Sequence, residues 1–311
     1  MSGRIEQIFS ELRSSGRRAV MPFVCGQHPR PGATGEILKA LQRAGAPIVE
    51  IGVPFSDPIA DGPTIAGAMH SALEAGASPR GLLEEIAAVR GELSIGLVAM
   101  VSVSIAHRLG GPEGFVELAA DSGFDGLIVP DLPLEASGGF LKACERRGLS
   151  LSLLVAPTTP EERVREIAAS SRGFVYLLAR AGITGEREGT VDLAGPVGRV
   201  RAATDLPIAA GFGISTPGQV AEAVRHADAA IVGSALVRRI GEASDPGGEA
   251  EAFVRSLVEA AVGPTASAGP EMSKGSGVSG GGCCRLRLAC EGVPVTMLYR
   301  RGEATPLFSS F

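Results

Sequence analysis

Short apolar runs alternate with amphipathic stretches along most of the chain. The runs predict buried strands at 19–24, 47–53, 94–101, 125–130, 149–155, 173–179, 206–210 and 228–232. The stretches that follow them have apolar residues at helical spacing and predict helices at 34–44, 64–75, 80–91, 112–122, 135–147, 160–170, 191–203, 216–225 and 234–262. Apolar strands that alternate with helices are typical of a parallel sheet.

Eight strand–helix units predict that this sheet closes into an α/β fold of the (β/α)8 TIM-barrel type. A doubly wound open sheet is the alternative, but no G-x-G-x-x-G follows the first strand. An amphipathic helix over residues 4–15 precedes the barrel, with Ile5 and Phe9 on its apolar face. Two capping boxes, which start at Thr159 and Thr216, support the predicted helix starts.

The last part of the chain differs in composition. Residues 263–282 are rich in Gly, Ser, Pro and Ala, which is typical of a linker. Beyond them, the spacing of Cys283, Cys284 and Cys290 matches no zinc pattern, and no helix or strand period is evident. We therefore expect a catalytic domain over residues 1–262 and a dispensable, disordered tail over residues 263–311.

Composition narrows the class of protein. The hydrophobic content of 45% with 20% charged residues indicates a globular protein with a sizeable core. The net charge of −5 favours neither nucleic acid nor an anionic membrane as a partner. The start of the chain lacks the apolar core of a signal peptide, and the barrel region holds only Cys25 and Cys144. A cytoplasmic location is the default expectation.

Two carboxylates stand out near the second predicted strand. Glu50 lies in the middle of an apolar run, where a carboxylate is costly unless it is paired or used, and Asp61 lies on the loop that follows. Such a pair suits general acid–base catalysis. The alternatives are that Glu50 pairs with an arginine and that Asp61 caps the next helix.

Glycines at the ends of the last three strands indicate a phosphate site. They occur in Gly182–Gly185, in Gly211–Ser215 and at Gly233, where Ser234 heads a helix. The loops after strands 7 and 8 are the usual phosphate site of this fold, although each glycine taken singly could merely form a turn.

Other residue types limit the reaction. No lysine ends a strand, which disfavours a Schiff-base aldolase, and the four histidines form no metal-ligand set. Proton transfer or cofactor-free carbon–carbon cleavage is what remains.

Six motifs together resemble the tryptophan synthase alpha chain family over about residues 5–260. The longest is Glu-Ile-Gly-Val-Pro-Phe-Ser-Asp-Pro-Ile-Ala-Asp-Gly-Pro-Thr-Ile at 50–65. The others, in the family's order and spacing, are at 126–133, 173–176, 182–185, 211–215 and 231–234.

The resemblance implies a lyase that cleaves indole-3-glycerol phosphate to indole and glyceraldehyde 3-phosphate. By this resemblance, Glu50 is the proton-transfer residue and Asp61 holds the indole N–H. The substrate-binding residues that it implies are Phe23, Leu127, Tyr176, Thr184, Gly185, Phe212, Gly213, Gly233 and Ser234.

The resemblance also implies a partner. Indole would pass to a tryptophan synthase beta chain in an α2β2 complex, where pyridoxal phosphate is expected; this chain itself would hold no cofactor and no metal. Asp57 and Pro58 would face the beta chain, and Asp131 and Thr184 would be coupled to loop closure.

Three segments depart from the family pattern. Residues 100–107 lack the usual Tyr and Asn, residues 25–29 are unusual, and the tail has no counterpart. Two other hypotheses therefore remain open: a lyase that works without a beta chain, and a regulatory subunit without catalysis. The two costly carboxylates argue against the regulatory hypothesis.

Overall fold

The computed structural model describes residues 3–58, 61–179, 193–211 and 213–262, together with the backbone of residues 283–290 and 293–300. Contacts divide the chain into two units between Thr265 and Ala266. The two units are described separately.

The first unit is built on a parallel sheet of nine strands in the order β5-β4-β3-β2-β1-β9-β8-β7-β6. The strands are β1 (Ala19–Cys25), β2 (Ile48–Gly52), β3 (Gly96–Met100), β4 (Gly126–Ile128), β5 (Ser150–Leu151), β6 (Leu154–Val155), β7 (Val175–Leu178), β8 (Ile208–Gly211) and β9 (Ala229–Val232).

The two ends of this sheet belong to one stretch of chain. Only Ser152 and Leu153 separate β5 from β6. The Ser152 N–H donates to the Leu127 carbonyl at 3.0 Å on one side, and the Leu153 carbonyl accepts from the Tyr176 N–H at 3.0 Å on the other. The fifth strand thus bonds to both neighbours and closes the ring, which confirms the predicted eight-unit barrel.

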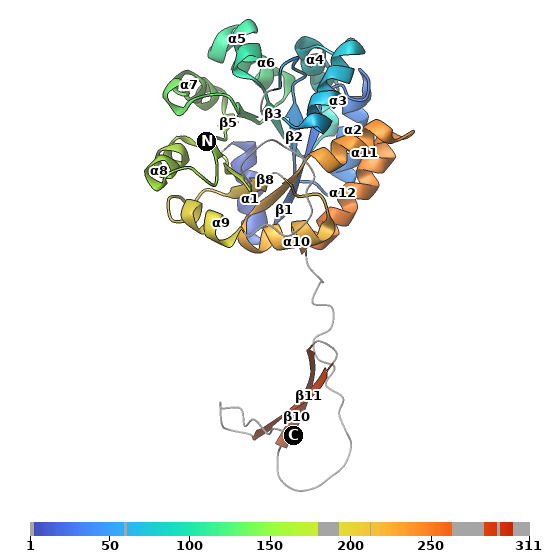
Figure 1. Cartoon of the computed structure of the whole chain (residues 1–311), viewed down its shortest axis with the longest axis vertical. Helices are drawn as coiled ribbons and strands as arrows, with labels where there is room; N and C mark the ends of the chain where they lie inside the picture. Colours follow the sequence, from blue (N-terminus) through green and yellow to red (C-terminus); the bar gives the residue numbers. More distant parts are fainter. Residues whose placement is uncertain are drawn as a thin grey trace. The chain divides into compact units, whose positions relative to one another are not determined.

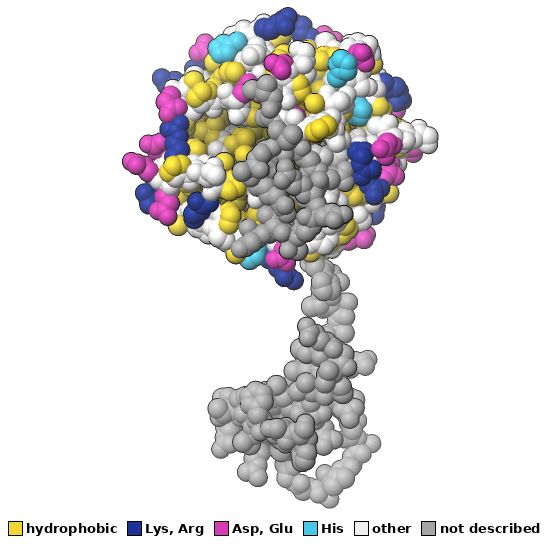
Figure 2. Space-filling view, viewed as in Figure 1, with side chains coloured by type: hydrophobic (Ala, Val, Ile, Leu, Met, Phe, Trp, Pro, Cys, Tyr) yellow, Lys and Arg dark blue, Asp and Glu magenta, His cyan; other side chains and the backbone are white. Residues whose placement is uncertain are grey.

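Helices surround the ring (Figure 1). They are α2 (Ala33–Arg43), α3 (Pro63–Glu74), α4 (Pro79–Val89), α5 (Val103–Arg108), α6 (Gly111–Ser122), α7 (Gly138–Arg147), α8 (Glu161–Ser170), α9 (Ala194–Arg201), α10 (Pro217–His226), α11 (Ser234–Glu242) and α12 (Pro246–Val262), with single 3-10 turns η1 (Arg90–Glu92) and η2 (Leu134–Ala136). Figure 2 shows the same view, with charged side chains around the rim and hydrophobic ones toward the middle.

The helix predictions need three corrections. Helix α5 was not predicted, and residues 234–262 were predicted as one helix where the structure has α11 and α12. The second helix starts afresh because the Asp245 carboxylate accepts the Gly248 N–H at 3.0 Å and Pro246 occupies the first helical position. The capping box at Thr216 is confirmed. The box at Thr159 is wrong, because that hydroxyl accepts from the Ala156 N–H at 3.0 Å and α8 has no side-chain cap.

Alternation along the strands sorts most of their side chains into two large cores. One core lies between strands and helices and includes Val49, Ile51 and Leu127. The other fills the barrel interior with side chains from β1, β2, β3, β4, β7, β8 and β9. Helix α1 (Arg4–Ser14) contributes Ile5, Ile8, Phe9 and Leu12 to this interior core, as the apolar face of the predicted helix requires.

The second unit contains an antiparallel hairpin of β10 (Cys283–Cys290) and β11 (Val293–Arg300), in which Leu286 pairs with Met297. No strand was predicted there, although the alternation Arg285-Leu286-Arg287-Leu288 is typical of one.

Asp228 ties the N-terminal helix to the strands that close the barrel. Its buried carboxylate accepts hydrogen bonds from Arg13, Arg18 and Arg201 and from the Ile208 N–H at 2.9 Å. Burial alone would raise the pKa of Asp228, but hydrogen bonds from Arg13, Arg201 and Ile208 outweigh it and lower that pKa.

We expect Asp228→Asn to lower the free energy of unfolding by about 2–3 kcal/mol, less than for a fully buried pair because water screens the half-exposed arginines. Because the folded pKa is lowered, this contribution is complete above about pH 4 and is lost as pH falls through the folded pKa. Urea unfolding between pH 3 and pH 7 measures it. Asp121→Asn, at an exposed ion pair with Arg147, is the matched control and should change little; equal effects of the two would contradict this role for Asp228.

Candidate active site

Glu50 lies in the interior of the barrel at the middle of β2, beside Phe23 of β1 and Val98 of β3 in the strand register. Its side chain is fully buried. Within the part of the chain that the structure describes, neither carboxyl oxygen of Glu50 has a hydrogen-bond partner. The alternative of a structural pair with an arginine therefore finds no support.

Burial governs the protonation of Glu50. Desolvation, followed by the nearby charge of Asp61, raises the pKa of Glu50 to about 8. Burial also raises the pKa of Asp61, to about 6. At pH 7 the site therefore holds one protonated and one ionised carboxyl group, which can act as an acid and as an anion side by side.

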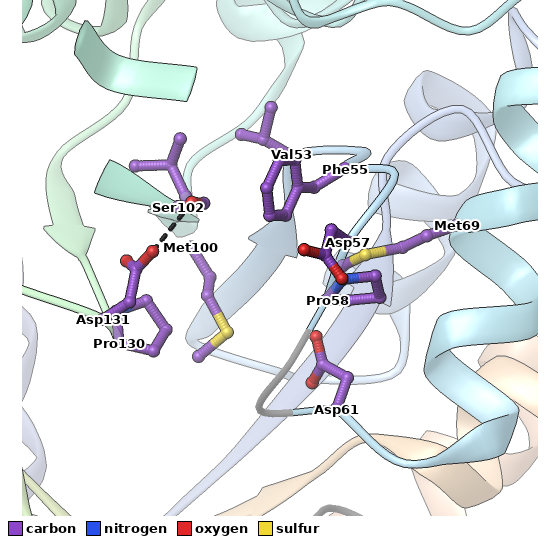
Figure 3. A pocket seen from close by; sticks show the side chains of 11 residues that line it. Val53, Phe55, Asp57, Pro58, Asp61, Met69, Met100, Ser102, Pro130 and Asp131 are labelled. Atoms are coloured by element: carbon purple, nitrogen blue, oxygen red, sulfur yellow. Dashed lines mark hydrogen bonds between the residues drawn. The ribbon is translucent and has the colours of Figure 1, made fainter. Parts of the chain in front are cut away.

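Asp61 comes from the loop between β2 and α3. Its N–H donates to the Pro58 carbonyl at 3.0 Å. The N-cap of α3 is Gly62, with no side-chain cap hydrogen bond, so the alternative role of Asp61 as a helix cap is wrong. Its carboxylate is left to face the pocket (Figure 3).

Tyr176 faces the same interior from β7. Its ring is buried, and a Cβ on residue 211 would lie 2.6 Å from the Tyr176 hydroxyl oxygen, so only glycine fits at the end of β8. Burial and the charges of Glu50 and Asp61 all raise the pKa of Tyr176. The structure thus brings together three of the predicted residues from two opposite sides of the ring.

A pocket, partly open to solvent, lies beside Asp61 and reaches the ends of β3 and β4. Its walls are mostly apolar, and Asp57, Asp61 and Asp131 supply the carboxylates. Figure 3 shows Met100 between Asp61 and Asp131. The pocket lining is Val53, Phe55, Asp57, Pro58, Asp61, Met69, Met100, Val101, Ser102, Pro130 and Asp131. Such a slot suits a flat apolar ring with one polar edge.

The atypical segment 100–107 forms one wall of this pocket. Asp131 accepts hydrogen bonds from the Ser102 hydroxyl and the Val103 N–H, both at 2.8 Å. Ser102 in turn caps α5 by accepting from the Ser104 N–H. These contacts were not predicted; the only signal for them in the sequence is Ser102 and Ser104 ahead of a short apolar stretch.

Phe23 packs with Cys25, Ile65 and Val237 in a small cluster separate from the interior core. Its assignment to the indole slot stays a prediction. Leu127 does not line the interior. It packs in the outer core between strands and helices, and its neighbour Ile128 takes the inward position on β4. The prediction was one residue out of register, which moves a strand residue to the other face.

The predicted phosphate residues lie at the ends of β8 and β9, which are neighbours in the sheet. Gly213 has φ +81°, a conformation that favours glycine. Gly233 is the N-cap of α11 and Ser234 its first residue. The first N–H groups of a helix have no partner within it, so this turn can bind an anion. Thr184, Gly185 and Phe212 lie outside the described residues.

Metal-binding and membrane-spanning features can be assessed for the described residues alone. These residues contain no group of three or more His, Cys, Asp or Glu side chains arranged to hold a metal ion. Within the same ranges, no helix is long and apolar enough to cross a membrane.

Comparisons with known proteins agree with this geometry. A sequence model of the family described as "Tryptophan synthase alpha chain" matches residues 9–262. The tryptophan synthase alpha chain of Synechococcus sp. (strain CC9902) is 46% identical over 266 residues, which cover 84% of this chain and 98% of that protein. The alpha chain of Methanosarcina barkeri is 45% identical over 258 residues, covering 82% of this chain and 95% of the relative.

Solved structures agree as well. A tryptophan synthase structure from Mycobacterium tuberculosis superposes with a TM-score of 0.78 at 33% identity, covering 84% of this chain and 99% of that one. The family match ends at residue 262, so the second unit lies outside it.

The desolvation of Glu50 predicts an unusual dependence of stability on pH. The pKa of Glu50 is higher in the folded than in the unfolded state. Below about pH 4.5 the group is neutral in both states and no charge is buried, whereas the free energy of unfolding decreases as pH rises from there toward 8. We expect Glu50→Gln to stabilise the protein at pH 8 by a few kcal/mol, with the gain vanishing near pH 4.5. Thermal unfolding followed by circular dichroism across this range measures the difference. Asp57→Asn, in the exposed part of the same loop, should show no such trend; a Glu50→Gln variant less stable at every pH would mean that the carboxylate is engaged.

Proposed function

This chain belongs to the tryptophan synthase alpha chain family, and on that premise we propose that Glu50 and Asp61 together carry out the lyase reaction of the family. The reaction is the retro-aldol cleavage of indole-3-glycerol phosphate to indole and glyceraldehyde 3-phosphate. The observation that carries the assignment of residues is a buried Glu50 whose carboxyl oxygens have no hydrogen-bond partner within the described ranges, close enough to Asp61 for that charge to raise its pKa.

Glu50 moves one proton out and takes one back. It starts protonated, as its raised pKa requires, and gives its proton to C3 of the indole ring. The resulting carboxylate then removes the proton of the hydroxyl group on the adjacent glycerol carbon. The bond between that carbon and C3 breaks, its electron pair restores the indole ring, and the hydroxyl carbon becomes the aldehyde. Glu50 ends protonated, ready for the next substrate.

Asp61 balances the charge that this sequence creates. Protonation at C3 places a positive charge on the ring, centred on its nitrogen, and an ionised Asp61 accepts the ring N–H and stabilises that charge. The low polarity of the pocket strengthens this interaction. Tyr176 packs beside Glu50 and positions it and the substrate.

The other end of the substrate needs an anion site. We assign the phosphate to Gly213, Gly233 and Ser234, with Thr184 and Gly185 completing the site, and the indole ring to Phe23, Phe212 and Ile128 in place of Leu127. The N-terminus of α11 offers N–H groups and the positive end of a helix dipole to the phosphate.

The product indole has a further destination. We propose that the chain works with a tryptophan synthase beta chain in an α2β2 complex in the cytoplasm, where pyridoxal phosphate on the partner supports the joining of indole to serine. Asp57 and Pro58 line the mouth of the pocket and would contact that partner. Asp131 is bonded to the segment 100–107, so loop closure and substrate position would act on each other there.

We expect kcat/KM for cleavage to follow a bell-shaped pH profile with flanks near pH 6 and pH 8, because ionised Asp61 and protonated Glu50 are required together. Glu50→Gln should lower kcat by roughly 10³-fold, within the range of general acid–base catalysis, and leave phosphate binding intact.

Asp61→Asn should retain weak activity, and its pH profile should lose the acidic flank. Indole release measured from pH 5 to 9 gives all three results, and full turnover by Glu50→Gln would remove Glu50 from the mechanism.

Addition of a beta chain tests the partner assignment. We expect slow indole release by the isolated chain and strong acceleration when a beta chain is added, as for a subunit whose loops close on partner binding. Ser102→Ala, which frees one Asp131 oxygen, should change the acceleration more than the basal rate. Fast release that ignores the partner would instead identify a lyase that works alone, and no release under either condition would favour a regulatory subunit.

A further inference from the structure

The β1–α2 loop, unusual in sequence, takes no part in the reaction described above, yet it is tightly held. Gln27 has φ 60°, which is uncommon for a residue other than glycine. Its N–H donates to the Thr34 hydroxyl at 2.8 Å, and its side-chain oxygen accepts from the Ser78 N–H at 2.8 Å. The loop is therefore fixed to α2 and to the start of α4.

The next residue, His28, reaches to the opposite side and lies against α11. Its ring is buried and hydrogen-bonds the backbone of Val237, in the first turn of that helix. The Nδ1 atom has no partner among the described residues, so Nε2 is the donor and the Val237 carbonyl the acceptor. A Cβ on Gly241 would lie only 2.9 Å from Nε2, so glycine one turn further on makes room for the ring.

Burial lowers the pKa of His28, so at neutral pH its ring is uncharged and carries one N–H, which donates to Val237. The charged form is not needed for this contact. The ring acts as a rigid, neutral spacer between an immobilised loop and a helix.

Val237 connects this contact to the site. Its N–H donates to the Gly233 carbonyl at 3.0 Å, and its side chain packs with Phe23 and Ile65. Gly233 itself lies against Phe23, where an added Cβ would come within 3.4 Å. The residue held by His28 is thus bonded to the glycine at which α11 begins.

From these contacts we propose that His28 is a positioning residue for the phosphate end of the site: through the Val237 carbonyl it fixes the first turn of α11, and so the N–H groups at Gly233 and Ser234. This inference rests on the proposed function, because it assumes that those groups hold the phosphate. Among the described residues, His28 forms no hydrogen bond or ion pair with Glu50 or Asp61, so we expect it to govern affinity and leave the chemical step unchanged.

The test compares variants by titration calorimetry with glycerol 3-phosphate as the probe, alongside KM and kcat. His28→Ala should raise the Kd of the probe and KM about 3- to 10-fold, the worth of one hydrogen bond, with kcat within about twofold. His28→Gln places an amide N–H at the level of Nε2 and should restore affinity. His28→Asn places it at the level of Nδ1 and should not. A merely structural role would not separate these two amides.

Gly241→Ala supplies a second, independent variant. Its added Cβ should push the ring from Val237 and weaken probe binding in the normal protein, although alanine favours the helix. In the His28→Ala background the same change should have no further effect on affinity. Additive effects of the two substitutions would overturn the proposal.

A control separates this inference from the proposed function. Ser234→Asp puts a like charge at the proposed phosphate site and should abolish probe binding. If it does so while His28→Ala leaves Kd unchanged, the positioning role is wrong and the phosphate site stands. If Ser234→Asp binds the probe normally, the phosphate assignment itself is wrong. Should His28→Ala fail to fold, the comparison of the His28→Gln and His28→Asn variants decides the question.

Discussion

Glu50 lies among apolar side chains inside a closed ring of strands, where its ionised form loses the hydration that it has in water and, among the described residues, gains no hydrogen-bonded cation in return. Its neighbours therefore set the chemistry as much as Glu50 does. The apolar interior keeps the carboxyl group protonated at neutral pH, and Asp61, nearer the pocket mouth, stays ionised. Because ionisation of Glu50 is unfavourable in this interior, Glu50 is held in the protonated form that can act as an acid. The packing of the rest of the core compensates for the free energy lost by burying a polar group.

Strand alternation makes this arrangement possible. Ile48, Glu50 and Gly52 are alternate residues of one strand, so the acid sits between an apolar residue below and a glycine that leaves space for Phe23 and Met69 above. Across the ring, the Tyr176 side chain of β7 lies against Gly211 at the end of the neighbouring strand β8. Each of these two glycines thus makes room for an aromatic ring.

Features that come from a repeating sequence pattern could be predicted, whereas contacts between residues far apart in the sequence could not. Eight strand runs and their helices predicted the barrel, and the motif from Glu50 to Ile65 predicted both carboxylates. Leu127 was assigned to the wrong face by the resemblance to the family, and the apolar run 126–129 has no alternation that would have shown which residue points inward. The bonds of Asp131 to Ser102 and Val103 could not be foreseen, because they join two loops that only the closed sheet brings together. Thr159 illustrates the opposite case. The sequence has the residues of a capping box, but the Thr159 hydroxyl accepts from the Ala156 N–H instead of capping α8.

The closure of the ring has a consequence for how the chain acquires its structure during synthesis. Strand β1 pairs with β9, and Arg18 beside β1 meets Asp228 beside β9 across 210 positions of sequence. One edge of β1 consequently stays without its partner until nearly the whole barrel has left the ribosome. Contacts of such long range form slowly, and an unpaired strand edge is a template for association with other chains. Arg13 and Arg18, which precede β1, bond to Asp228 beside β9, and so stabilise the closed barrel at the step when that edge disappears.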